Sequence, residues 1–177
     1  MSELDELAAL AHMAPASGPP VDWSDVARRL GFTPPADYIA LIDSYGGGLL
    51  DDDLNIFVPG AQMPLYDLTL EGPSLADDAR FHWDQYPDSP KPAAVDRPGV
   101  ELVAWASTPD SEHLYWIVDV SQPSSRWPIA LEQAQEHDWE IFHTTTVGFL
   151  LGLLRGTIPS EYLGVYAERD RHTYEQY

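Results

Sequence analysis

Apolar residues recur at helical spacing in three segments of the first fifty residues, and each segment predicts a helix. The first covers residues 2–13. The second begins at Asp22, a favourable N-cap, and ends at Gly31, which suits a helix C-terminus. The third starts with Thr33 as the expected cap and Pro34 in the first helical position, and it ends at a run of three glycines.

A run of small and Pro-rich residues separates the first expected helix from the rest. Residues 14–20 read Ala-Pro-Ala-Ser-Gly-Pro-Pro, which cannot hold a helix and is typical of a linker. We therefore divide the chain into an N-terminal helix with its linker (1–20), a folded domain (21–158) and a C-terminal extension (159–177). The pattern leaves open whether the first helix docks on the domain or is mobile. The polar, Tyr-rich extension predicts a short helix and a frayed end.

The segment after the three glycines predicts a hairpin and then a long interrupted helix. Two short apolar runs are joined by Asp51-Asp52-Asp53, which gives a hairpin with an acidic tip. From Pro64 to Tyr86 the spacing is helical, but Gly72-Pro73 is expected to break it. The stronger half of this helix therefore begins after the break.

Beyond a Pro-rich loop at residues 87–98, the periodicity changes from helical to extended. The expected strands cover residues 101–107, 113–118, 127–131 and 138–142. A last helix, capped by Thr144 or Thr145, ends at Gly156. Helices first, strands next and a closing helix, without β-α-β alternation, predict an α+β fold. Its antiparallel or mixed central sheet has about five or six strands, with helices packed on it.

Charge is the most unusual property of the composition. Nine Lys and Arg face 29 Asp and Glu, so the net charge is −20. Such a chain repels nucleic acid phosphates and anionic membranes, and it attracts basic proteins. We therefore expect a protein partner and neither a nucleic acid nor a membrane. An alternative is that the acidity only keeps the protein soluble or reflects a salt-rich habitat.

Other features of the composition predict a cytoplasmic protein. The chain has no cysteine, which excludes disulfides, thiolate nucleophiles and Cys-ligated metals. Its acidic N-terminus is not followed by a long apolar stretch, unlike a secretory signal.

The most specific local signature runs from Leu30 to Gly48 and reads Leu-Gly-Phe-Thr-Pro-Pro-Ala-Asp-Tyr-Ile-Ala-Leu-Ile-Asp-Ser-Tyr-Gly-Gly-Gly. It resembles the opening helix of the SUKH superfamily, Leu-x-x-(Leu/Phe)-Pro-x-x-(Tyr/Phe)-x-x-(Leu/Phe)-(Leu/Ile)-x-x-(Tyr/Asn)-Gly-Gly. The likeness continues from about Trp23 to Thr157. Aromatic residues of the second half are similar in kind and order, namely Trp105, Tyr115-Trp116, Trp127 and Trp139.

This resemblance implies a SUKH-like scaffold and a role in protein binding. The family includes fungal cell-wall-assembly regulators and many bacterial immunity proteins. The residues that match its pattern pack a core or turn the chain, and none of them supplies a nucleophile, a base or a metal ligand. The resemblance therefore predicts the fold more directly than the partner.

The best candidate for catalysis is Glu136-His137-Asp138-x-Glu140-x-x-His143, which offers two imidazoles and several carboxylates. On a strand, however, His137 and His143 occupy distant positions. We therefore interpret the stretch as solvated acidic residues, and we expect no metal, no cofactor and no enzymatic activity. A metal-dependent hydrolase that uses these histidines is the weaker alternative.

The function that the sequence indicates best is a cytoplasmic immunity protein, an antitoxin that binds and blocks a basic toxin domain of the nuclease type. The rival is an intracellular regulatory scaffold without a toxin partner. The oligomeric state is not predicted. The candidate partner-binding residues are acidic side chains on turns, helix edges and strands: Asp51, Asp52, Asp53, Asp77, Asp78, Asp84, Asp110, Glu112, Glu132, Glu136, Asp138 and Glu140.

Overall fold

A seven-stranded sheet forms the centre of the protein in the computed structural model, which describes residues 1–177. Its strand order is β6-β5-β4-β3-β2-β1-β7, and every neighbouring pair is antiparallel. The strands are β1 (Gly48–Leu50), β2 (Leu54–Ile56), β3 (Val100–Ser107), β4 (Glu112–Asp119), β5 (Ile129–Gln133), β6 (Asp138–Phe142) and β7 (Tyr174–Gln176). The helices are α1 (Glu3–Leu10), α2 (Trp23–Leu30), α3 (Ala36–Tyr45), α4 (Leu68–Gln85) and α5 (Thr146–Arg155), with short 3-10 turns η1 (Pro64–Tyr66), η2 (Ser124–Arg126) and η3 (Gly164–Glu168). The α+β fold is confirmed, and the sheet has more strands than expected.

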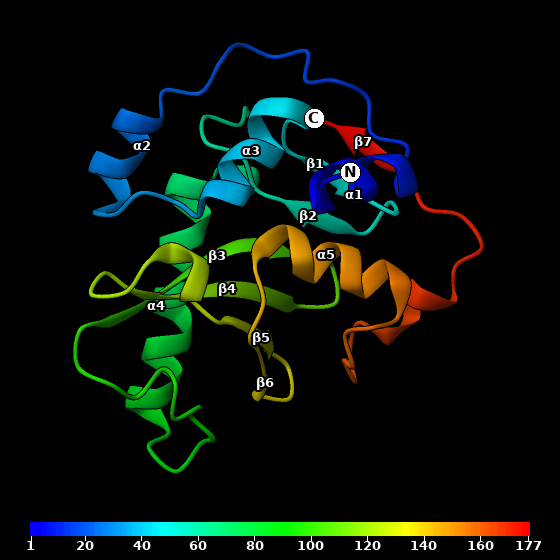
Figure 1. The fold of residues 1–177 in the computed structure, drawn as a ribbon. Helices are drawn as coiled ribbons and strands as arrows, with labels where there is room; N and C mark the ends of the chain where they lie inside the picture. Colours follow the sequence, from blue (N-terminus) through cyan, green and yellow to red (C-terminus); the bar gives the residue numbers. More distant parts are fainter.

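Helices cover both faces of the sheet. On one face Tyr38 of α3 meets the Trp116 ring of β4 at 4.8 Å, and the Trp116 indole donates to Thr146 of α5 at 3.0 Å. On the other face the Tyr115 hydroxyl donates to the Leu75 carbonyl of α4 at 3.3 Å. Successive residues of a strand point to opposite faces, so Tyr115 and Trp116 belong to different layers of the core. In Figure 1, α5 crosses in front of the sheet and α4 passes behind it.

The ends of the helices follow the expected caps, with one exception. Asp22 and Thr145 each accept hydrogen bonds from the first turn of the helix that follows, and Gly31 adopts the left-handed conformation at the end of α2. Helix α3, however, begins two residues later than predicted, and Thr33 does not cap it. The reason is that Pro34 precedes a second proline, which disfavours the helical conformation at Pro34.

The expected break at Gly72-Pro73 is wrong, because α4 runs continuously through both residues. Gly72 serves close packing instead. A Cβ at this position would lie 2.6 Å from the backbone oxygen of Ala104 on β3. The helix therefore approaches the sheet more closely there than any side chain would allow. No helix of the fold, α4 included, is both long and apolar enough to cross a membrane.

The C-terminal extension does not end in a frayed tail. It contains η3 and then β7, which pairs with β1 and completes one side of the sheet. The Tyr174 hydroxyl donates to the Gly46 carbonyl at 2.7 Å, and the Tyr177 ring stacks on Tyr66 at 4.5 Å. These aromatic contacts, rather than an alternating apolar pattern, hold the strand in place, and for that reason the sequence did not predict it.

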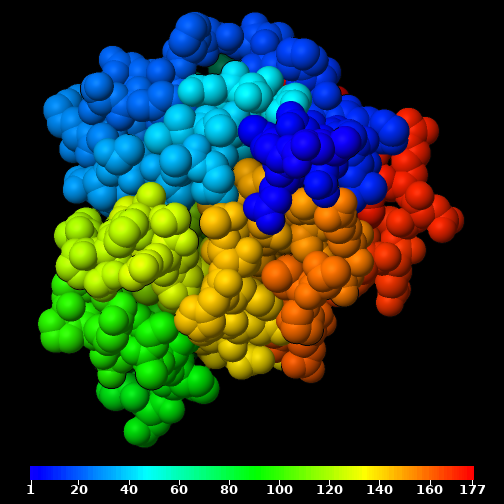
Figure 2. Space-filling view, in the orientation of Figure 1, coloured from blue at the N-terminus to red at the C-terminus, as the bar shows by residue number.

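The N-terminal helix docks on the domain. Leu7 and Ala11 are fully buried in the same core as the rest of the chain, and Glu6 forms an ion pair with Arg155 of α5. The linker is held as well, because the Gln176 side chain donates to the Ala14 and Pro15 carbonyls at 2.9 Å each. Figure 2 shows α1 seated against α3 and α5.

Candidate partner-binding surface

Three of the predicted surface residues are buried, so their assignment to a partner-binding surface is wrong. The first is Asp51, which is 2% exposed although it lies in the hairpin turn. Its carboxylate accepts from the Thr173 backbone N–H and contacts the His172 ring nitrogen, each at 2.8 Å. Asp51 therefore ties the C-terminal segment to the hairpin. Within this turn only Asp52 is exposed, since Asp53 is half-buried and accepts from the Tyr166 hydroxyl at 2.8 Å.

Glu112 and Glu132 are the other two buried residues. Glu112 accepts from Gln133 at 3.1 Å and from Thr108, next to the turn in which Asp110 remains exposed. Both carboxylates are satisfied inside the protein and cannot reach a partner.

The Glu132 carboxylate takes part in a small polar cluster beneath α4. It accepts from the Tyr115 hydroxyl at 2.6 Å, and the His113 ring lies 3.4 Å away. Burial raises the pKa of the Tyr115 hydroxyl well above its usual value, and the negative charge of Glu132 adds to the effect. The hydroxyl therefore stays protonated and donates to the carboxylate.

The acidic residues of α4 lie on two flanks of the helix rather than on one edge. Asp77 and Asp84 share a flank, where Asp77 pairs with Arg80 at 2.9 Å. Asp78 lies on the opposite flank, one turn before His82. All three carboxylates are exposed. They do not form a single edge, however, because Asp78 points in a different direction from Asp77 and Asp84.

A pair of stacked histidines joins the Asp78 flank of α4 to the turn between β5 and β6. The His82 and His137 rings lie 3.6 Å apart, with 10° between their planes. His137 adopts a positive φ of 54°, which turns the chain sharply between Glu136 and Asp138. Because of this contact, Asp78 and the exposed carboxylates of the turn belong to one surface.

The surface continues around β6, the outermost strand. Asp138 accepts from the Tyr162 hydroxyl at 2.6 Å, and Glu140 accepts from the Glu161 backbone N–H at 2.7 Å. The hydrogen bond to Asp138 raises the pKa of Tyr162, and nearby carboxylates raise it further. We define the acidic edge as the carboxylates on both sides of this strand: Glu71, Asp78, Glu136, Asp138, Glu140 and Glu161.

Two properties characterise the acidic edge, although carboxylates elsewhere, such as Glu168, Asp170 and Glu175, also lack an ion pair. None of its carboxylates forms an ion pair with Lys or Arg, whereas Asp25, Asp77, Asp96 and Asp119 all do. The strand itself is also unpaired on its outer side, because residues 138–142 make backbone hydrogen bonds to β5 and to no other segment. The edge therefore combines uncompensated negative charge with free backbone donors and acceptors.

The structure does not bring together the histidines of the catalytic alternative. His137 precedes β6 and His143 follows it, so the two lie roughly 20 Å apart along a strand that rises about 3.3 Å per residue. His137 stacks on His82, whereas His143 lies near Glu3 and Arg126. No group of three or more His, Asp or Glu side chains is arranged to hold a metal ion.

Sequence reasoning missed Glu71, Glu161 and the histidine stack. Glu71 is half-buried beside Asp78, and its place on the same helical flank could have been read from the seven-residue spacing. Glu161 and the stack depend on contacts between distant segments, for which the sequence carries no local signal.

Comparison with protein-family models, with curated proteins and with solved structures gives no match. The SUKH resemblance therefore remains a prediction.

Proposed function

We propose that this chain is a non-catalytic binding protein, an immunity protein that binds and blocks a basic toxin domain through its acidic edge. The observation that carries the proposal is the group of unpaired carboxylates along a strand whose outer backbone is free. Carboxylates that lack a cation within the protein favour one supplied by a partner. A free strand edge can add an extended segment of that partner to the sheet.

A nuclease toxin fits this surface because its substrate cleft must be basic to hold phosphates. With a net charge of −20, the chain would be steered towards such a cleft and could occupy it in place of nucleic acid. Steering raises the association rate more than it fixes specificity. Specificity would come from exposed apolar anchors. Phe81 on α4 is 65% exposed, and Tyr86, directly after the last residue of α4, is 62% exposed. The Tyr86 ring lies beside His82 of the histidine stack.

Co-expression with the product of the neighbouring gene tests the proposal. If that product is a toxin, we expect the chain to restore growth of the host cell and to co-purify with the toxin domain. A toxic neighbour that is neither neutralised nor bound would contradict the immunity function. Binding without any toxicity would favour the regulatory scaffold instead.

A further inference from the structure

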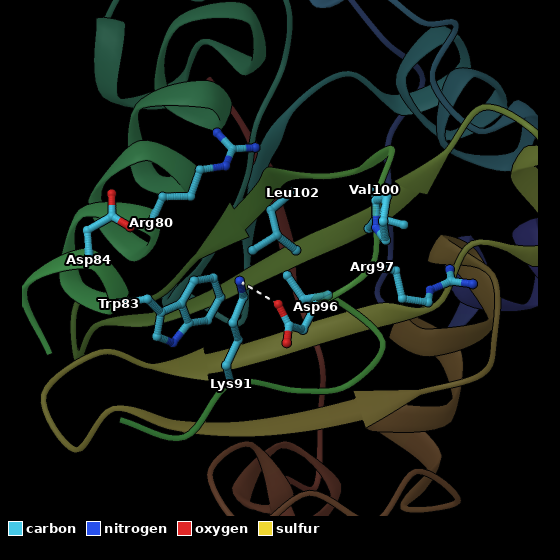
Figure 3. Close-up of a pocket in the computed structure, with 10 residues that line it drawn as sticks. Arg80, Trp83, Asp84, Lys91, Asp96, Arg97, Val100 and Leu102 are labelled. Carbon is cyan, nitrogen blue, oxygen red and sulfur yellow. Dashed lines mark ion pairs between the residues drawn. The ribbon is translucent and has the colours of Figure 1, made fainter. Parts of the chain in front are cut away.

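The flank of α4 opposite the acidic edge borders a hollow of about 590 Å³. It is bordered by the helix, by the loop at residues 87–98 and by the start of β3, and it is open to solvent. Figure 3 shows Val100 and Leu102 at the back of the hollow, with Trp83 and Lys91 side by side in front of them. Its apolar lining is formed by Val95, Val100 and Leu102, beside the Trp83 ring.

This hollow gathers basic side chains on a strongly acidic protein, and each of them pairs with an aspartate: Asp77, Asp96 or Asp119. Arg80, Lys91 and Arg97 line it, which is a third of the nine Lys and Arg in the chain. Lys91 is the most central of them. Its ammonium lies 5.0 Å from the centre of the Trp83 ring and 3.1 Å from an Asp96 oxygen. The cation therefore already sits between an aromatic surface and a carboxylate.

The ion pairs of the hollow are open to exchange. Asp96 is 70% exposed and Lys91 is 37% exposed, and the Arg97 to Asp119 distance is a long 3.5 Å. Pairs at such exposed sites contribute little to stability, so a carboxylate from outside can replace the internal one at small cost. The apolar floor is fixed more firmly, because the Trp83 indole donates to the Pro90 carbonyl at 3.0 Å.

We propose that this hollow is a binding site for a small carboxylic acid that carries an apolar ring. The carboxylate would take the place of Asp96 beside Lys91, and the ring would lie on Val95, Val100 and Leu102. A volume of this size is in the usual range for ligand pockets, which run from about 300 to 1,000 Å³. The site lies on the flank of α4 away from the acidic edge and does not depend on the immunity function.

Phenylacetate is the probe for this site, and NMR titration of the full chain is the measurement. We expect saturable binding at millimolar concentration, with the largest shift at the Trp83 indole N–H. Lys91→Met should weaken binding about two- to fivefold, the size expected from losing an ion pair at a partly exposed site. The neutral analogue 2-phenylethanol and the ringless acetate should both bind more weakly than phenylacetate.

Arg28→Met on α2 is the control for Arg80→Met, because each arginine pairs with an aspartate three residues earlier on its own exposed helix face. Arg80→Met should weaken binding of phenylacetate, and Arg28→Met should leave it unchanged. Equal affinities for the parent, Lys91→Met and Arg28→Met would overturn the assignment. So would the absence of any saturable shift at Trp83 in the folded parent protein.

Discussion

At the scale of single residues, burial rather than residue type decides what each carboxylate does. Asp51 and Asp52 are neighbours in one turn and both have positive φ, of 55° and 62°. Asp51 is enclosed by His172 and Thr173, whereas Asp52 faces solvent. In the sequence Asp51 and Asp52 cannot be told apart. Only the packing of the C-terminal segment makes Asp51 a buried structural residue and leaves Asp52 as a surface charge.

This difference predicts unequal effects of the same substitution. Asp51→Asn should lower the free energy of unfolding by about 1–3 kcal/mol, because the new amide cannot satisfy every buried donor around it. Asp52→Asn should change stability by less than about 0.5 kcal/mol. Asparagine tolerates a positive φ as aspartate does, so backbone strain is matched between the variants. Urea unfolding of both variants is the measurement, and equal losses would contradict the anchoring role of Asp51.

Glu71 predicts a pH dependence at the acidic edge. Burial raises the pKa of its carboxyl, the neighbouring His113 lowers it, and Asp78 raises it. Because the pKa of Glu71 is higher in the native state than in the unfolded state, the native state binds the carboxyl proton more tightly. The contribution of Glu71 to stability therefore falls as pH rises through the unfolded and then the native pKa. Glu71→Gln should therefore be more stable than the parent at neutral pH, and the difference should vanish below about pH 3.

Denaturant unfolding of the parent and of Glu71→Gln, at neutral pH and below about pH 3, checks this prediction. Glu101→Gln on β3 is the control, because that side chain is exposed. A Glu71→Gln variant that is less stable than the parent at neutral pH would show that the ionised carboxylate stabilises the fold, contrary to the expectation.

At the scale of elements, the packing of α4 on β3 determines where the acidic edge and the hollow lie. Leu68, Ala76 and Trp83 are buried on the side of α4 that faces the sheet. The two remaining flanks carry Asp78 and Arg80. A small shift of this one helix would therefore change both proposed sites.

Gly72→Ala tests the close packing of α4. In an exposed helix this substitution would be stabilising by about 1 kcal/mol. Here the new Cβ would approach the Ala104 oxygen to 2.6 Å and the Val103 side chain to 2.9 Å, so we expect a loss of about 1–3 kcal/mol. Gly164→Ala, whose Cβ would meet nothing within 4 Å, is the control and should be nearly neutral. An increase in stability for Gly72→Ala would contradict the packing described above.

The elements that the sequence predicted best are those with local signals. The β6 strand was predicted with its observed ends, and Gly31 and Gly156 end their helices in the left-handed conformation as expected. The errors have non-local causes. Helix α4 passes through Pro73 because Gly72 packs on a distant strand, and β7 forms because Tyr174 and Tyr177 contact residues more than a hundred positions away.

The candidate surface was predicted only in part. Seven of the twelve proposed carboxylates are exposed, but their grouping depends on which side of a helix or sheet they occupy. The stack of His82 on His137, which joins Asp78 to the β5–β6 turn, has no counterpart in any local pattern. Charge could be counted from the sequence, whereas its arrangement could not.

At the scale of the whole molecule, the basic side chains are distributed unevenly. Carboxylates without cationic partners lie along β6 and the adjoining flank of α4, whereas three of the nine cations line the hollow on the other flank. A net charge of −20 would attract any basic protein, but only a localised surface can orient one. Binding of a basic partner is therefore expected to depend on where the negative charge lies, not only on its sum.

The most direct test uses the basic partner that co-purifies with the chain. Its affinity is measured for two charge-reversed variants of the chain. One variant replaces Asp78, Glu136 and Asp138 of the acidic edge with lysine. The other replaces Glu168, Asp170 and Glu175, which are exposed elsewhere, and changes the net charge by the same amount. Calorimetric titration at about 0.15 M and 1 M salt compares them, since the Debye length falls from about 8 Å to about 3 Å.

We expect the acidic-edge variant to lose at least about tenfold in affinity at the lower salt concentration, equivalent to about 1.4 kcal/mol, and to lose most of its salt dependence. The control variant should bind nearly as the parent does. Equal affinities for the two variants would contradict the central claim that this protein binds its partner through the β6 side of the sheet.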